Sequence, residues 1–97
     1  MKIVYAPQQN DSLTVSYSFD GESVTATVNG QSETWDFSDM PEGRAQPGPN
    51  GEPSISADVL PVCPVVDAER VNGELTVTML DWYHDHTNPP QQREEVV

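Results

Sequence analysis

One segment of the chain gathers residue types that can hold a metal ion, the run Asp81-Trp82-Tyr83-His84-Asp85-His86. In an extended strand His84 and His86 would point to the same side, and two imidazoles so placed could supply part of a Zn²⁺ or Ni²⁺ site. The sequence has no second cluster of histidine or cysteine to complete such a site. We therefore expect no metal and no cofactor, and we interpret the run as a solvated strand end with Trp82 and Tyr83 as aromatic anchors.

The rest of the sequence offers no catalytic arrangement. Its single cysteine, Cys63, lies in a Pro-Val-Cys-Pro run with no basic neighbour to lower its pKa, and alone it forms no intrachain disulfide. No serine occupies a nucleophile-elbow pattern, no glycine-rich loop opens a helix, and the acidic residues have no spacing that marks a general acid/base pair. We predict that the protein is not an enzyme.

The charge of the chain limits its partners. Sixteen acidic residues against four basic ones give a formal net charge of −12, which repels phosphate backbones and anionic lipids. Direct binding to nucleic acid or to a membrane surface is thereby disfavoured. The N-terminal residues are too poor in apolar side chains for a signal peptide, and no run approaches membrane-spanning length, so we expect a cytoplasmic location.

Residues 12–37 alternate apolar and hydroxyl side chains, with Asp20-Gly21 and Asn29-Gly30 at the two interruptions. This pattern predicts a three-stranded meander, because Asn-Gly and Asp-Gly favour the tight turns of β-hairpins. If both dipeptides are two-residue loops, the expected partners are Phe19 with Glu22, Tyr17 with Val24, Val15 with Ala26, Leu13 with Val28, Val28 with Gln31, Ala26 with Glu33, and Val24 with Trp35.

This pairing predicts one apolar face and one hydroxyl-rich face exposed to water. Glu33 is the exception on the apolar side, and we expect it to reach solvent near its turn. The apolar face comprises Leu13, Val15, Tyr17, Phe19, Val24, Ala26, Val28, Trp35 and Phe37. The opposite face comprises Thr14, Ser16, Ser18, Ser23, Thr25, Thr27, Ser32, Thr34 and Asp36.

A second hairpin is predicted from 62 to 82, closed at Asn72-Gly73. Its expected pairs are Arg70 with Leu75, Ala68 with Val77, and Val66 with Met79. Two sheets that are each apolar on one side need a cover, and the simplest cover is each other. The fold class is therefore all-β, a small antiparallel sandwich or rolled open barrel, to which residues 3–6 could add an edge strand.

The 97 residues fit one domain, residues 1–86, with a long Pro/Gly loop at 41–54 and an extended or flexible C-terminal tail at 87–97. Four prolines and three glycines forbid a regular helix or central strand within 38–54. Such a loop is usually functional or mobile, so it and the tail are the places to look for partner contacts. The candidate protein contacts are Pro47, Pro49, Trp82, Tyr83 and Arg93.

Three stretches carry a family resemblance, namely Val28-Asn29-Gly30, the segment 35–43 (Trp-Asp-Phe-Ser-Asp-Met-Pro-Glu-Gly) and the late hairpin 64–80 with its Glu69-Arg70 pair and Asn72-Gly73 turn. They resemble a family of short proteins encoded in tail modules of tailed bacteriophages and prophages. These stretches lie within residues 28–80, a span of about half the chain. The motifs are structural and imply no catalytic residues.

The resemblance implies an accessory structural or assembly protein of the phage tail. Its implied partners are other tail or tail-fibre proteins, or further copies of itself within the virion. Its implied location is the host cytoplasm during assembly or the virion tail. The alternative, suggested by the charge of −12, is an acidic inhibitor of a host protein that mimics DNA, which would need carboxylates in two rows on one face. That alternative depends on where Asp20, Glu22, Asp36, Asp67, Glu69 and Glu74 lie on the folded surface.

Overall fold

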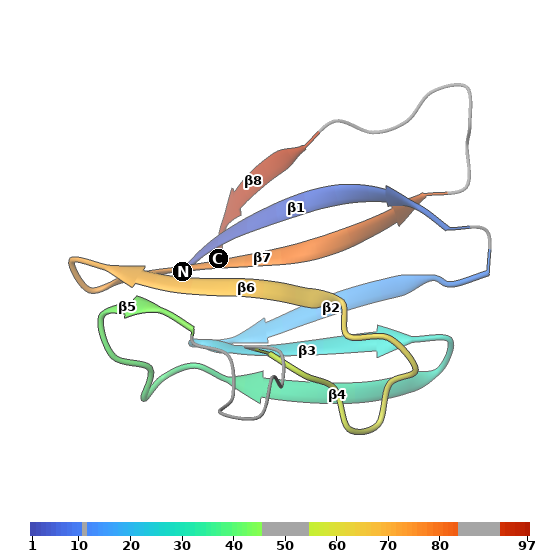
Figure 1. Cartoon of the computed structure of the whole chain (residues 1–97), viewed down its shortest axis with the longest axis horizontal. Coiled ribbons are helices and arrows are strands. Elements are labelled where there is room, and N and C mark those ends of the chain that lie inside the picture. The colour runs from blue at the N-terminus through green and yellow to red at the C-terminus, as the bar shows by residue number, and fades with distance from the viewer. Residues whose placement is uncertain (11, 46–54, 84–91) are drawn as a thin grey trace.

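The computed structural model describes residues 1–10, 12–45, 55–83 and 92–97, and every regular element in these ranges is a β-strand (Figure 1). The all-β prediction is confirmed. The strands are β1 (Lys2–Gln9), β2 (Val15–Asp20), β3 (Ser23–Val28), β4 (Gln31–Asp36), β5 (Gly43–Arg44), β6 (Val65–Val71), β7 (Glu74–Tyr83) and β8 (Arg93–Val96).

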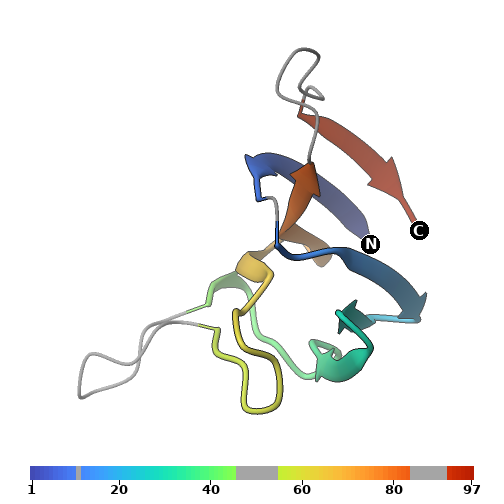
Figure 2. The same cartoon turned by 90° about the vertical axis from the view of Figure 1, so that its right-hand side faces the viewer.

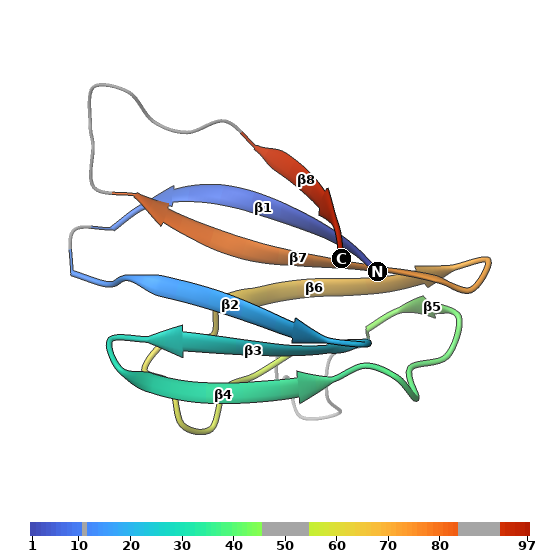
Figure 3. The ribbon, with the colours of Figure 1, turned by 180° about the vertical axis from the view of Figure 1, so that it is seen from behind.

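The strands form two sheets that pack face to face. Sheet A has the order β5-β6-β7-β1-β8, and sheet B is the meander β2-β3-β4. Figures 1 and 2 show the two sheets as separate layers, and Figure 3 shows the meander from behind. The architecture is therefore an open sandwich, as predicted, and not a closed barrel.

The second turn of the meander follows the predicted register. Val28 pairs with Gln31, Ala26 with Glu33 and Val24 with Trp35. Both turn residues have positive φ, 49° at Asn29 and 89° at Gly30, as the tight type I′ turn requires.

The first turn lies one residue later than predicted, which shifts the strand partners by two residues. Asp20 pairs with Ser23 and Phe19 with Val24, so the loop is Gly21-Glu22 rather than Asp20-Gly21. The physical reason is that Gly21, with φ of 60°, occupies the first loop position, where a type II′ turn needs glycine. Because a shift of two residues preserves the side-chain alternation, the predicted faces are correct although the predicted partners are wrong.

The second hairpin is correct near its turn and wrong at its far end. Arg70 pairs with Leu75 and Ala68 with Val77, as predicted. Met79, however, pairs with Val65 and not with Val66, because a β-bulge lies between Val65 and Asp67. The extra residue reverses the alternation, so that Val65 is buried and Val66 is 44% exposed.

The N-terminal strand is central rather than at an edge. β1 lies between β7 and β8, and it runs parallel to β7 with Ile3 opposite Val77. The sheet is therefore not purely antiparallel. β8, within the predicted tail, is extended and pairs antiparallel with β1, and β5 lies within the predicted loop and pairs with β6.

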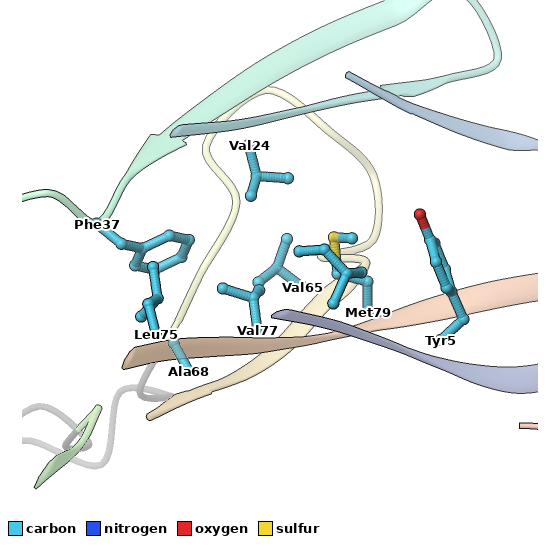
Figure 4. Packing of buried hydrophobic residues seen from close by; sticks show 9 residues of the cluster. Tyr5, Val24, Phe37, Val65, Ala68, Leu75, Val77 and Met79 are labelled. Atoms are coloured by element: carbon cyan, nitrogen blue, oxygen red, sulfur yellow. The ribbon is translucent and has the colours of Figure 1, made fainter. Parts of the chain in front are cut away.

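The core lies between the sheets in two clusters. The first cluster, drawn in Figure 4, contains the buried residues Ile3, Tyr5, Val24, Phe37, Val65, Ala68, Leu75, Val77 and Met79. The second contains Ala26, Val28, Leu60 and Trp82. β7 contributes Leu75, Val77 and Met79 to the first cluster and Trp82, near its end, to the second.

Candidate protein-contact surface

The predicted contact residues have different positions in the structure. Trp82 is only 7% exposed and belongs to the second core cluster, where its indole N–H donates to Oε1 of Gln8 at 2.5 Å. Tyr83, the last residue of β7, is half-buried. Pro47, Pro49, His84 and His86 lie outside the described residues. Of the predicted contact residues, the described part of the chain includes Trp82, Tyr83 and Arg93.

Arg93 lies on β8 and contacts the neighbouring strands of its own sheet. Its Nη1 lies 2.6 Å from Oδ2 of Asp81, and its guanidinium lies 4.3 Å from the centre of the Tyr5 ring. Arg93 therefore holds β8 against β1 and β7. It is exposed, as a contact residue would be, but its charged group is already engaged within the chain.

A different surface, the loop 55–64, has the features of a contact site, although none of its residues was among the predicted contacts. The loop is anchored by Glu33 of β4. Oε1 of Glu33 accepts the backbone N–H groups of Asp58 at 3.1 Å, Val59 at 2.8 Å and Leu60 at 3.2 Å. Oε2 accepts the Asp58 N–H at 2.8 Å. One carboxylate thereby orders three consecutive peptide groups of the loop.

Two further anchors hold the loop at its ends. The indole N–H of Trp35 donates to the carbonyl of Ser56 at 3.0 Å, and the N–H of Leu80 donates to the carbonyl of Pro64 at 2.8 Å. Between them, the side chain of Leu60 is 6% exposed and packs in the second core cluster. The loop is thus attached to both sheets by specific contacts.

Although it is anchored, this loop presents apolar side chains to solvent. Val59 is 56% exposed and Val62 is 42% exposed, and Pro61 between them is also exposed. In Figures 1 and 3 the loop extends past β4, beyond the body of the sandwich. An apolar loop held in one conformation loses little further entropy on binding, which is a property of preorganised interfaces. We name residues 58–62 the apolar loop.

The signal for this site was the inward position of Glu33 in the predicted register. A carboxylate on an apolar face needs hydrogen-bond donors, and the backbone N–H groups of a nearby loop can supply them. From the sequence we expected Glu33 to reach solvent instead. The donors are not evident from the sequence, because nothing in the local pattern places Asp58 beside Glu33 of β4, 25 residues away in the chain.

The hydrogen bonds also shift the titration of Glu33. Donation from the N–H groups of Asp58 and Val59, the largest causes, lowers the pKa of Glu33 from its ordinary value of 4.5. A lowered pKa in the folded state means that the unfolded chain binds more protons on acidification. The stabilisation from Glu33 is therefore complete above pH 4.5 and is lost as the pH falls through the lower, folded-state pKa.

Replacing Glu33 by glutamine should loosen the apolar loop. The neutral amide offers one acceptor oxygen in place of two charged ones, so the N–H groups of residues 58–60 should exchange with solvent faster near neutral pH, as measured by hydrogen exchange. The difference in unfolding free energy between variant and parent should narrow below pH 4.5. Glu74→Gln, at an exposed hairpin position, is the matched control. Unchanged exchange at 58–60 would show that Glu33 does not anchor the loop.

The carboxylates that a DNA mimic would need are distributed over both sheets. Asp20 and Asp36 flank Ser23 on the outer face of sheet B. Asp67 and Glu69 lie on the outer face of sheet A, where Arg44 contacts them at 3.4 Å and 3.3 Å. The outer faces of a sandwich point in opposite directions. These positions do not form two rows on one face, so they give the inhibitor hypothesis no support.

The described residues contain no group of three or more potential metal ligands and enclose no pocket. Within those same ranges, no helix has the length and apolar character to cross a bilayer. Comparison of the chain with protein-family models, with curated proteins and with solved structures finds no match in any of the three.

Proposed function

We propose that the protein is an accessory structural or assembly component of a bacteriophage tail, which docks on a larger tail or tail-fibre protein. The resemblance in segments 28–30, 35–43 and 64–80 supports the phage assignment. The apolar loop supports the docking role. It is the single observation that carries the proposal, because this loop combines exposed apolar side chains with a dense set of anchoring hydrogen bonds.

The chemistry of the apolar loop indicates the kind of surface on which it docks. Val59, Pro61 and Val62 would fill an apolar recess, and such anchors in a desolvated pocket dominate the energy of many interfaces. The chain carries a net charge of −12, and Asp58 lies within the loop itself. Electrostatic complementarity therefore favours a recess with a basic rim, which would also accelerate association.

The assignment to a tail is tested by mass spectrometry of purified phage particles and of tail assembly intermediates from the host that carries the gene. The expected result is the presence of the chain in at least one of the two, at a fixed ratio to a tail protein. Its absence from both would contradict the proposal.

The docking role is tested with the double variant Val59→Asp/Val62→Asp. Both side chains are exposed, so the fold should persist, whereas two carboxylates cannot enter an apolar recess. We expect the Kd for isolated tails to rise at least roughly 30-fold, since a hot-spot residue contributes about 2 kcal/mol or more. Co-sedimentation with purified tails measures this change.

The matched control is Val71→Asp. Val71 is 53% exposed, as Val59 and Val62 are, but it lies at the end of β6 beside the Asn72-Gly73 turn. This variant should bind tails as the parent does. Equal loss of binding in both variants would show that added negative charge, and not the apolar loop, is responsible.

A further inference from the structure

The edge of sheet A at β1 is occupied by β8, which contributes nothing to the core. β8 pairs antiparallel with β1, with Val96 opposite Lys2 and Glu94 opposite Val4. All four β8 residues are exposed, and neither core cluster includes any of them. Figure 1 shows β8 at the margin of the sheet, next to β1.

Among the described residues, the side-chain contacts that hold β8 lie at the surface. Lys2 Nζ lies 3.2 Å from Glu94 Oε2, and Arg93 contacts Asp81 and the ring of Tyr5. Exposed ion pairs of this kind add little stability and are weakened further by salt. Since every core residue belongs to other elements, β8 can leave β1 while the sandwich stays folded, as low-stability edge elements do.

β1 without β8 would present a free edge that accepts a strand. Those N–H and C=O groups of Lys2–Tyr5 that face β8 would be unpaired, while β1 remains paired with β7 on its other side, and such an edge pairs readily with another extended segment. The segment that fits this edge is known from the structure itself. A β8 from another molecule would carry Arg93 to Tyr5 and Asp81, and Glu94 to Lys2, without any new contact having to be formed.

We propose that β1 is an acceptor for β8 of a second copy of this chain, so that molecules associate by exchanging this strand. In the closed form β8 pairs with β1 of its own chain, and in the exchanged form it pairs with β1 of another copy. Both forms therefore have the same β1–β8 contacts. Their balance therefore depends on the joining segment and on concentration, because a tethered strand competes at an effective concentration of about millimolar. Dilute protein should be closed, and crowded copies should exchange. This inference does not depend on the assignment to a phage tail.

The test uses two chains that each carry one cysteine, in a Cys63→Ala background. One carries Val4→Cys and the other Glu94→Cys, positions that lie directly opposite each other on β1 and β8. Antiparallel neighbours have Cα atoms about 4.5–5.5 Å apart, within the range that a disulfide spans. Because each chain has a single cysteine, a disulfide between the two different chains is favoured over random collision only where β8 of one copy lies beside β1 of the other.

The two chains are mixed at about millimolar concentration under mild oxidation, and the mixed disulfide is measured on a non-reducing gel. We expect it to accumulate with time and to exceed, by on the order of tenfold, the product of Val4→Cys mixed with Glu95→Cys. Glu95 lies opposite Ile3, so its side chain points to the other face of the sheet. Equal yields in the two mixtures would mean random collision and would overturn the proposal.

A single chain that carries both Val4→Cys and Glu94→Cys completes the test. If this chain closes its own disulfide while the mixed chains form none over days, β8 does not exchange and the proposal is wrong. If the double variant forms no internal disulfide either, β8 does not lie on β1 in this register, and the proposal is again wrong.

Discussion

Replacing Trp82 by alanine is expected to lower the free energy of unfolding by about 3–5 kcal/mol, the usual cost of removing a large buried aromatic side chain. The indole is 7% exposed and packs with Ala26, Val28 and Leu60 between the sheets. A domain of this size is stable by only about 5–15 kcal/mol, so much of its stability would be lost. Urea denaturation followed by circular dichroism measures the change.

Trp82→Phe separates packing from hydrogen bonding at this position. Phenylalanine retains most of the buried area but cannot donate to Oε1 of Gln8. The lost hydrogen bond accounts for about 0.5–1.5 kcal/mol, so we expect a much smaller effect than that of alanine. If Trp82→Ala is instead as stable as the parent and loses only partner binding, the indole is a contact residue, as the sequence analysis proposed.

The sequence predicted best those features that depend on neighbouring residues. The Asn29-Gly30 and Asn72-Gly73 turns have the predicted positions, because both need positive φ at an Asn-Gly pair, and the local alternation then assigned the faces. The errors arose where a single residue changes the strand register or the side-chain alternation. Gly21 began the first turn instead of ending it, and the bulge at Val65 and Val66 reversed the alternation at the start of β6.

Features that join distant parts of the chain could not be predicted in this way. The parallel pairing of β1 with β7 connects Ile3 to Val77, and no local pattern encodes that partner. The apolar loop was missed for the same reason, since its conformation depends on Glu33 in another element. Trp82 was assigned to the surface because its segment also contains charged residues, whereas its indole packs within the second core cluster.

Arg70 shows how a long-range contact can unite the two sheets. Its side chain is 12% exposed, and all of its N–H groups have acceptors. Nε donates to the carbonyl of Met40 at 2.7 Å, and both terminal nitrogens lie 3.0 Å from the carboxylate of Glu22. Nη2 also donates to the carbonyl of Phe37 at 3.0 Å. A residue of sheet A thereby binds the first turn of sheet B and the end of β4.

Arg70→Met should therefore lower the melting temperature far more than Arg44→Met. Methionine fills similar space but leaves the Glu22 carboxylate and the carbonyl of Met40 without the Arg70 donor, and the carbonyl of Phe37 keeps only the N–H of Met40. Arg44 is 61% exposed in its surface ion pairs, which are worth at most about 1 kcal/mol. Arg70→Lys should not restore the parent's stability, since an ammonium group cannot reproduce the bidentate geometry. Equal melting temperatures of the two methionine variants would refute a joining role for Arg70.

A second substitution separates the loss of the contact from the cost of an unpaired carboxylate. Glu22→Gln added to Arg70→Met should recover part of the stability, because no charge then remains without its partner where the two sheets meet.

The pH dependence of stability gives an independent check on the Arg70–Glu22 pair. The hydrogen bond from Arg70 lowers the pKa of Glu22 from 4.5, so the pair stabilises the fold fully above pH 4.5. The difference between parent and Arg70→Met should accordingly shrink as acid protonates Glu22, and a difference that stays constant would place the effect in packing alone.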